Sequence, residues 1–338
     1  MEYMTLSNPT ELDVTLNSTG STSMINGTVN EISGGLIVYI IVVFVPIGMV
    51  SIIGNAVVVL TIYRYPSLQI VRNYYIGSLA VADFLTGCIA VPGAIMHYIL
   101  IRGSFSGANM RDGVTIYVMP LFLFSWASIH NLLLITWDRY LAVVHPLDYV
   151  SKATKKRAFL YITVAWAVSF IPILIPFFWG MDTNGHGTIR IKSNANMIRN
   201  YICSGYFFII LTIMVKLHMS TYIIARKKER ELPGTIISTK QKHGSELAIE
   251  LQLKSFKTIS LVLIVFVTCL TPLTVLTYVE YIWSVSIPWL VWFTEAIVFA
   301  SSMVNPFIYA YRRQDFRQAF KRTFRCKLSH SALSTTTV

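Results

Sequence analysis

Four ionisable side chains lie inside or at the end of long apolar stretches: Asp83, Asp138, Arg139 and Glu295. A charge in hydrocarbon is costly unless it pairs or faces water, so each is a functional candidate. An adjacent acid and base can form an ion pair that opens and closes, and an isolated carboxylate can hold a cation. The sequence shows no nucleophile beside a base and no cluster of metal ligands, so we do not expect an enzyme.

The composition favours a membrane protein. Of the 338 residues, 54% are hydrophobic and only 13% are charged, too few for the surface of a soluble protein of this size. The formal net charge is +12, but most of the Lys and Arg residues lie in every second connector and in the C-terminal tail. That asymmetry indicates topology through the positive-inside rule, so nucleic acid is not expected as a partner.

Seven hydrophobic segments are each long enough to cross about 30 Å of hydrocarbon as a helix. They lie near 36–63, 73–100, 114–140, 158–180, 200–225, 256–283 and 288–311. Because the second, fourth and sixth connectors are not basic whereas the tail is, the N-terminus is predicted outside and the tail in the cytoplasm. We therefore predict an all-α protein, a seven-transmembrane helix bundle in the plasma membrane.

With its two ends included, the chain is predicted to have four regions. These are a disordered, glycosylated extracellular N-terminus (1–35), the bundle (36–311), an amphipathic juxtamembrane helix (312–326) and a cytoplasmic tail (327–338). The N-terminus is polar and holds two glycosylation sequons, at Asn17 and Asn26.

The amphipathic helix is predicted from Phe316, Phe320 and Phe324, which recur every four residues among Arg and Lys. Such a helix lies on the inner surface of the membrane and contacts its lipid. Cys326 at its end is a palmitoylation candidate, and an unmodified reduced thiol is the alternative.

A transporter with a polar relay is an alternative function for the bundle. Asp83, His130 and Glu295 would then pass protons, as Asp, Glu and His do in membrane pumps. The relay requires charged groups that continue to the inner side, where the fifth and sixth segments offer only Lys216 and His218. An odd number of crossings without a visible repeat also fits poorly with the paired repeats of many transporters.

Short motifs recur along the segments in a set order. They are Gly54-Asn55-Ala56-Val57-Val58, the run Ser78-Leu79-Ala80-Val81-Ala82-Asp83, Asp138-Arg139-Tyr140, Trp166, Phe266 with Pro272, and Asn305-Pro306-Phe307-Ile308-Tyr309. Together they resemble the motifs of the rhodopsin-like (class A) G-protein-coupled receptors, across about residues 36–326. The stretches SLAVADFLTG and WDRYLAVVHPLDY are loosely nearest the amine-receptor branch.

The resemblance implies a receptor that transmits binding of an extracellular small molecule to a heterotrimeric G protein. Its switch residues would be Asp138, Arg139, Tyr140, Pro306 and Tyr309. Held by Asp138, Arg139 keeps the cytoplasmic side closed; once released, it meets the G protein.

Many family members also pair this arginine with a glutamate on the sixth helix. Gln252 stands at that position here, with Glu250 two positions away. That inter-helix lock is therefore in doubt, and an atypical or constitutively active receptor without a classical ligand stays an alternative.

The resemblance also implies a sodium pocket formed by Asp83, Ser128, Ser302 and Asn305. Oxygen ligands suit such a hard cation. A water-filled network around Asp83 without sodium is the alternative, and no other metal is expected.

Three departures from the family change the expected outer half. Val114 stands where the family has the cysteine of its loop disulfide, so no disulfide is expected. Leu121 replaces the aspartate with which amine receptors hold the ligand ammonium. Phe299 replaces the lysine to which opsins attach retinal, so covalent retinal is excluded and no organic cofactor is expected.

The predicted ligand cavity is therefore mostly apolar, with one charge. Glu295 lies ten residues before Asn305, hence about 15 Å nearer the outside, and is taken as the only acidic side chain of the outer half. It is the candidate to hold a cationic ligand at the cavity mouth. An exposed rim residue, or one paired with His97, is the alternative. The other candidate ligand-binding residues are Leu121, Phe122, Ser125, Thr277, Tyr278 and Phe299.

Overall fold

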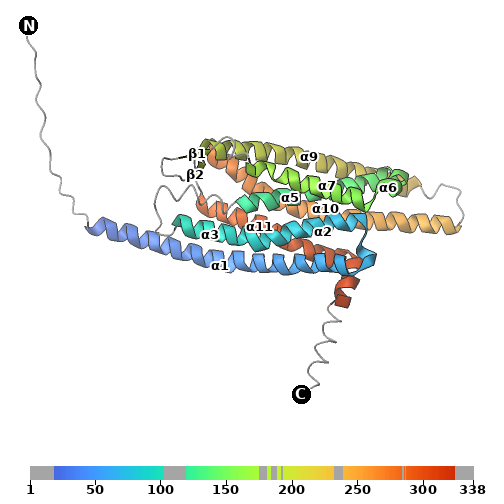
Figure 1. Ribbon diagram of the computed structural model, residues 1–338, viewed down its shortest axis with the longest axis horizontal. Coiled ribbons are helices and arrows are strands. Elements are labelled where there is room, and N and C mark those ends of the chain that lie inside the picture. The colour runs from blue at the N-terminus through green and yellow to red at the C-terminus, as the bar shows by residue number, and fades with distance from the viewer. Residues whose placement is uncertain are drawn as a thin grey trace, which may run out of the picture.

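The protein is a bundle of seven long helices lying side by side (Figure 1). The computed structural model describes residues 19–102, 119–174, 181–183, 189–191, 193–231, 239–283, 285 and 287–323. Within them, seven helical spans are long and apolar enough to cross a membrane. The predicted all-α, seven-transmembrane class is confirmed.

The crossings and their connectors follow one another along the chain. The crossings are α1 (Thr19–Arg64), α2 (Val71–Leu85) continued through the π-helical turn η2 (Thr86–Ala90) into α3 (Val91–Arg102), α5 (Met119–Val144), α7 (Lys155–Ser169), α9 (Ser193–Glu231), α10 (Thr239–Ile282) and α11 (Pro288–Arg312). The connectors include the 3-10 turn η1 (Pro66–Leu68), the short helix α6 (Pro146–Lys152) and two short antiparallel strands, β1 (Met181–Thr183) and β2 (Ile189–Ile191). In Figure 1 the strands and α6 lie at opposite ends of the bundle.

Helix α1 begins earlier than expected. Its apolar span is Val38–Arg64, close to the predicted 36–63, but the helical backbone starts at Thr19. The backbone of residues 19–35 is helical, whereas the sequence predicts disorder there. A helix already nucleated by an apolar span extends at little cost in free energy per residue. Asn17 and Cys326 lie outside the described residues, and Asn26 is described only through its helical backbone. The domain division and both modifications stay predictions.

Helices α9 and α10 are longer than the predicted segments 200–225 and 256–283. Their extra turns carry the charged residues that hydropathy assigns to a connector. Hydropathy detects where the apolar part of a helix stops, and a helix continues into water where its residues permit it.

Helix α5 lies in the middle of the bundle and packs against α2, α7, α9 and α10. It ends at Val144, and Pro146 opens α6, as the His145-Pro146 pair predicts. Proline suits the first turn of a helix because its missing N–H would have no partner there. The third crossing, placed at 114–140 from the sequence, is described from Met119 onward.

The second crossing contains a distortion next to Pro92. The π-helical turn of residues 86–90 ends two residues before the proline, which cannot donate to the helix ladder. At this turn Gly87 lies against α1, and a Cβ atom built on it would come within 2.8 Å of the carbonyl oxygen of Gly48. Glycine is thus required for the approach of the two backbones.

The segment after α11 forms a helix over residues 314–323, as predicted from its phenylalanines. Phe316 is fully buried and contacts Tyr309, with ring centroids 5.8 Å apart, so the helix packs against the bundle as well as presenting basic residues. Asp315 forms ion pairs with Arg313 and Arg72. Burial opposes ionisation of Asp315, but its hydrogen bond to Arg313 outweighs this and holds the pKa of that carboxyl below its usual value.

Replacing Gly87 with Ala is expected to destabilise the protein by about 1–3 kcal/mol, because the new methyl group collides with backbone that cannot move independently. Thermal unfolding of the purified protein would measure the loss. Gly205→Ala is the matched control, since no atom lies within 4 Å of a Cβ placed there. An unchanged melting temperature for Gly87→Ala would show that α1 and α2 are not held as described.

Candidate functional site

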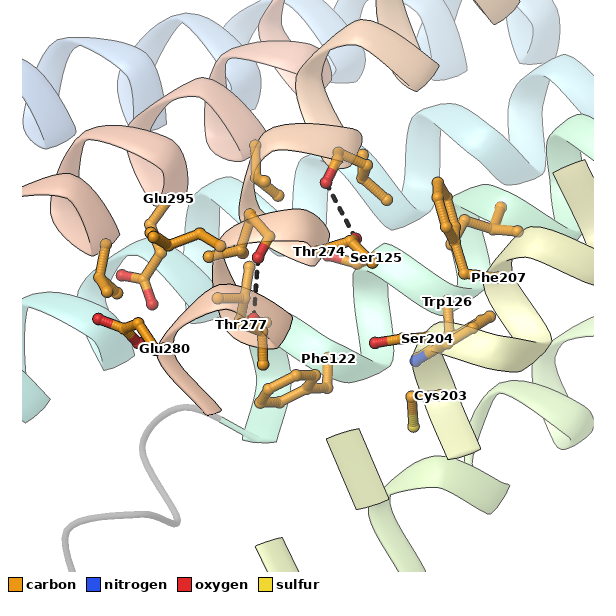
Figure 2. A pocket seen from close by; sticks show the side chains of 17 residues that line it. Phe122, Ser125, Trp126, Cys203, Ser204, Phe207, Thr274, Thr277, Glu280 and Glu295 are labelled. Atoms are coloured by element: carbon orange, nitrogen blue, oxygen red, sulfur yellow. Dashed lines mark hydrogen bonds between the residues drawn. The ribbon is translucent and has the colours of Figure 1, made fainter. Parts of the chain in front are cut away.

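A cavity of about 270 Å³ opens between α5, α9, α10 and α11. Apolar and aromatic side chains form most of its wall, which is typical of small-molecule sites. Figure 2 shows the side chains that line it. They are Leu121, Phe122, Ser125, Trp126, Ile129, Cys203, Ser204, Phe207, Leu270, Leu273, Thr274, Leu276, Thr277, Glu280, Val291, Glu295 and Val298.

Five of the seven predicted ligand-binding residues lie in this wall: Leu121, Phe122, Ser125, Thr277 and Glu295. Tyr278 and Phe299 do not line the cavity. Phe299 is fully buried and packs edge-on against Phe44 of α1, with ring centroids 5.3 Å apart.

The two exceptions follow from helix geometry. Tyr278 is one residue, and so about 100° of rotation, beyond Thr277. On α11 the residue three positions after Glu295, Val298, shares its face, and Phe299 turns toward α1 instead.

Glu295 is buried, 9% exposed, and lies in the wall rather than on an exposed rim. Its partner is not His97, as one alternative proposed, but the hydroxyl group of Tyr98, which donates to Oε2. The ring of Tyr98 is itself packed edge-on against Trp292, with centroids 6.0 Å apart. The carboxylate is therefore held in place by a side chain of α3.

Glu280 also lines the cavity, so the expectation that Glu295 is the only acidic side chain of the outer half is wrong. The Oε1 atom of Glu280 accepts a hydrogen bond of 2.8 Å from the backbone N–H of Ile287, just before α11. The signal was present in the sequence, because Glu280 follows Thr277 by three residues and so shares its helix face.

The far end of the cavity holds aromatic and small polar side chains that the sequence alone did not single out. Trp126, Ser204 and Phe207 lie together there, away from Glu280 and Glu295 (Figure 2). Leu270 of α10 forms part of the same wall.

His130 supports this end through a chain of hydrogen bonds. The hydroxyl of Ser169 donates to the carbonyl of Ala165 at 2.7 Å, so it accepts from Nδ1 of His130 at 2.8 Å. Nε2 then accepts from the hydroxyl of Tyr206 at 3.0 Å. Every donor has an acceptor when the ring is neutral, and the network ties α5 to α7 and α9 next to Trp126.

The predicted sodium-pocket residues meet around Asp83, which is 1% exposed. Ser128 donates to Oδ1 at 3.2 Å and Asn305 to Oδ2 at 2.7 Å, and Ser302 also hydrogen-bonds to the carboxylate. The structure thus brings α2, α5 and α11 together at this carboxylate.

The oxygen atoms around Asp83 fit a hard cation. The carboxylate and two hydroxyl groups are suitable ligands. Asn131, three residues after Ser128 on α5, has a buried carbonyl oxygen without a hydrogen-bond partner among the described residues. Such an orphaned acceptor needs a water molecule or an ion.

The predicted switch lies at the end of α5 near α6. A guanidinium nitrogen of Arg139 is 3.6 Å from Oδ2 of Asp138, and both side chains are largely buried. Tyr149 of α6 donates to Oδ1 of Asp138 at 2.8 Å. Burial and the Asp138 carboxylate both raise the pKa of Tyr149, so its phenol keeps the proton that this bond requires.

The remaining switch candidates lie apart from this pair. Tyr140 stacks on Trp137 with ring centroids 5.8 Å apart. Pro306 is buried against α1, where a Cβ atom on Gly54 would come within 2.9 Å of its ring. Tyr309 is buried beneath Phe316. The side chains of Glu250 and Gln252 lie outside what the structure describes.

The three groups of the alternative polar relay have separate partners. Asp83 bonds to α5 and α11, His130 to α7 and α9, and Glu295 to α3. These hydrogen bonds lead to neutral side chains and not to another member of the relay. This arrangement favours a structural role for these polar groups over proton transfer.

A seven-helix bundle with a ligand-sized cavity at one end, a buried polar centre and a closed ion pair at the other end defines the class of membrane receptors. The family "7 transmembrane receptor (rhodopsin family)" matches residues 54–309. The chain belongs to this family: it is a multi-pass membrane receptor and not an enzyme.

Curated relatives agree with this assignment. The chain is similar to adenosine receptor A2a of Cavia porcellus, with 29% identity over 313 residues, 85% of this chain and 73% of the relative. It is 27% identical to octopamine receptor beta-1R of Drosophila melanogaster over 308 residues, 82% of this chain and 59% of that receptor. It is 32% identical to D(2) dopamine receptor A of Xenopus laevis over 218 residues, 62% and 48% of the two chains.

Proposed function

We propose that this receptor lies in the plasma membrane with its N-terminus outside, binds a positively charged small molecule in the cavity of α5, α9, α10 and α11, and activates a heterotrimeric G protein. The family supports the receptor mechanism, and the two carboxylates in the cavity support a cationic ligand. The names of the relatives, receptors for adenosine, octopamine and dopamine, support a small molecule.

The distribution of charge supports the orientation. α6 and the start of α7, which carry Lys152, Lys155, Lys156 and Arg157, lie at the end opposite the β1–β2 hairpin (Figure 1). Basic connectors are retained on the cytoplasmic side. The cavity then opens toward the outside and Arg139 toward the cytoplasm.

One observation carries the proposal: a single helix forms part of both sites. α5 contributes Leu121, Phe122 and Ser125 to the cavity and Asp138 and Arg139 to the ion pair. A ligand that prefers one position of α5 therefore shifts the equilibrium of the ion pair, because a ligand favours whichever state it binds better.

Arg139→Ala is expected to reduce G-protein activation at least tenfold, because the guanidinium is the group that the open state presents. Receptor in lipid nanodiscs would be mixed with each class of purified heterotrimer and nucleotide exchange measured. Lys156→Ala, an exposed basic residue at the same end, is the control. If no class of G protein responds to the wild type, or if Arg139→Ala responds as well as it does, the proposal is wrong.

Tyr149→Phe is expected to raise exchange without ligand, by roughly up to tenfold, because a hydrogen bond to a charged group contributes about 1.5–3 kcal/mol and here holds Asp138 in the closed pair. The same exchange assay would measure it. Tyr161→Phe, in the same region but half-exposed, should leave the basal rate unchanged. A basal rate equal to that of the wild type would exclude Tyr149 as part of the resting lock.

We further propose that sodium binds at Asp83 and stabilises the resting state, supported by the oxygen donors and the orphaned carbonyl of Asn131. Sodium should raise the melting temperature by about 2–4 °C over choline at equal ionic strength. Asp83→Asn should remove this difference, whereas Asp148→Asn, an exposed carboxylate, should retain it. A sodium effect that persists in Asp83→Asn would place the ion elsewhere or leave only water at this site.

A further inference from the structure

Two carboxyl groups lie at the same end of the ligand cavity. Glu280 comes from the end of α10 and Glu295 from α11, and Figure 2 shows their carboxyl groups pointing toward one another. The inference below concerns the charge of the ligand and rests on the function proposed above.

The hydrogen bonds that these carboxylates make within the protein come from neutral groups. Glu295 accepts from the hydroxyl of Tyr98 through Oε2, and Glu280 accepts from the backbone N–H of Ile287 through Oε1. Among the described residues that line the cavity there is no Lys, Arg or His. Within the described lining, the acidic charge of Glu280 and Glu295 is therefore not balanced by a basic side chain.

Such an arrangement favours a ligand with more than one positive charge. Glu295 is 9% exposed, and a buried carboxylate is costly unless a cation compensates it. Two carboxylates at one end of the cavity offer two places for a cation, and a ligand with a single ammonium group can fill only one of them. A metal ion is a poor substitute, because no group of three His, Cys, Asp or Glu side chains within the described residues is placed to hold one.

The rest of the cavity specifies an apolar body. From the acidic end the wall continues past Phe122 and Leu273 to Trp126 and Phe207. Thr277 and Thr274 donate their hydroxyl protons to carbonyls of their own helix, at 2.8 and 3.0 Å, so they offer a ligand only acceptors (Figure 2). A ring or short chain fits here, with its charged groups left at Glu280 and Glu295.

We propose that the receptor recognises an aryl- or alkyl-substituted diamine, in which Glu295 binds one ammonium group, Glu280 binds the second, and the apolar substituent extends toward Trp126 and Phe207. Tyr98 is a positioning residue in this site, since it touches Glu295 and holds its carboxylate. The ligand thus enters with its charge toward α10 and α11 and not toward Leu121 of α5.

A pair of isosteric probes tests this charge requirement. N-benzylpropane-1,3-diamine and N-benzylbutylamine differ only in the replacement of the terminal amino group by a methyl group. Binding of each to purified full-length receptor would be measured by calorimetry and by the shift of the melting temperature, for wild type, Glu280→Gln and Glu295→Gln. Glu229→Gln, an exposed glutamate of α9 outside the cavity, is the matched control.

The wild type should bind the diamine at least tenfold more tightly than the monoamine. Glu280→Gln should remove most of that preference while leaving monoamine affinity within about threefold, because the ammonium that faces Glu280 is absent from the monoamine. Glu295→Gln should weaken both probes by roughly thirtyfold or more, since it removes a buried charge partner. Glu229→Gln should change neither affinity.

Equal affinity of the two probes for the wild type would overturn the proposal, as would undetectable binding of the diamine. An equal loss of both probes in Glu280→Gln would show that the two carboxylates share one ammonium group. Should Glu295→Gln fail to fold, the half-buried Glu280→Gln decides the question alone. These outcomes are independent of signalling: tight diamine binding without Arg139-dependent nucleotide exchange would support the ligand class and contradict the proposed G-protein function.

Discussion

The structure depends on satisfying a carboxylate in the middle of an apolar bundle. Asp83 receives hydrogen bonds from Ser128 on α5 and Asn305 on α11, and hydrocarbon could not replace them. Asn55 of α1 joins the same region by donating to the backbone carbonyl of Ser302 at 2.9 Å. Four helices are thereby held at one level, and the close contacts of Gly54 with Pro306 and of Gly87 with α1 become possible around it.

This polar centre lies between two regions of different chemistry, the ligand cavity and the Asp138–Arg139 ion pair. On one side of it, apolar side chains form most of the cavity wall, with acidic groups at one end. On the other side, Asp138 and Arg139 form an ion pair with a separation of 3.6 Å, and Tyr149 of α6 donates a hydrogen bond to Asp138. Since α5 passes through all three levels, a change in its position alters each of them, which is the physical basis for a receptor without chemistry of its own.

The ligand site shows how function varies on a constant frame. The buried centre and the ion pair follow the motifs of the family, whereas the charged groups of the cavity come from α10 and α11, with Leu121 at the α5 position. A site is defined by its side chains rather than by its fold. The same bundle can therefore recognise a different molecule when its acidic side chains lie on different helices. The hydroxyl of Tyr98 on α3 holds the carboxylate of Glu295 in this site.

By itself the sequence determined the membrane class and the number of crossings, because apolar length is a local property of a chain. The family motifs in the sequence pointed to the centre around Asp83 and to the Asp138–Arg139 pair. Five of the seven residues proposed for ligand binding line the cavity, and their role in binding stays a prediction.

Only the tertiary structure decided the rest. Four contacts depend on how helices distant in the sequence rotate and approach one another. Glu295 bonds to Tyr98 and not to His97, and Glu280 faces the same cavity. Phe299 packs against Phe44 instead of lining the cavity, and Tyr149 bonds to Asp138. A one-residue step turns a side chain by about 100°, so helix rotation decides which neighbour it meets, and that rotation results from the packing of the whole bundle.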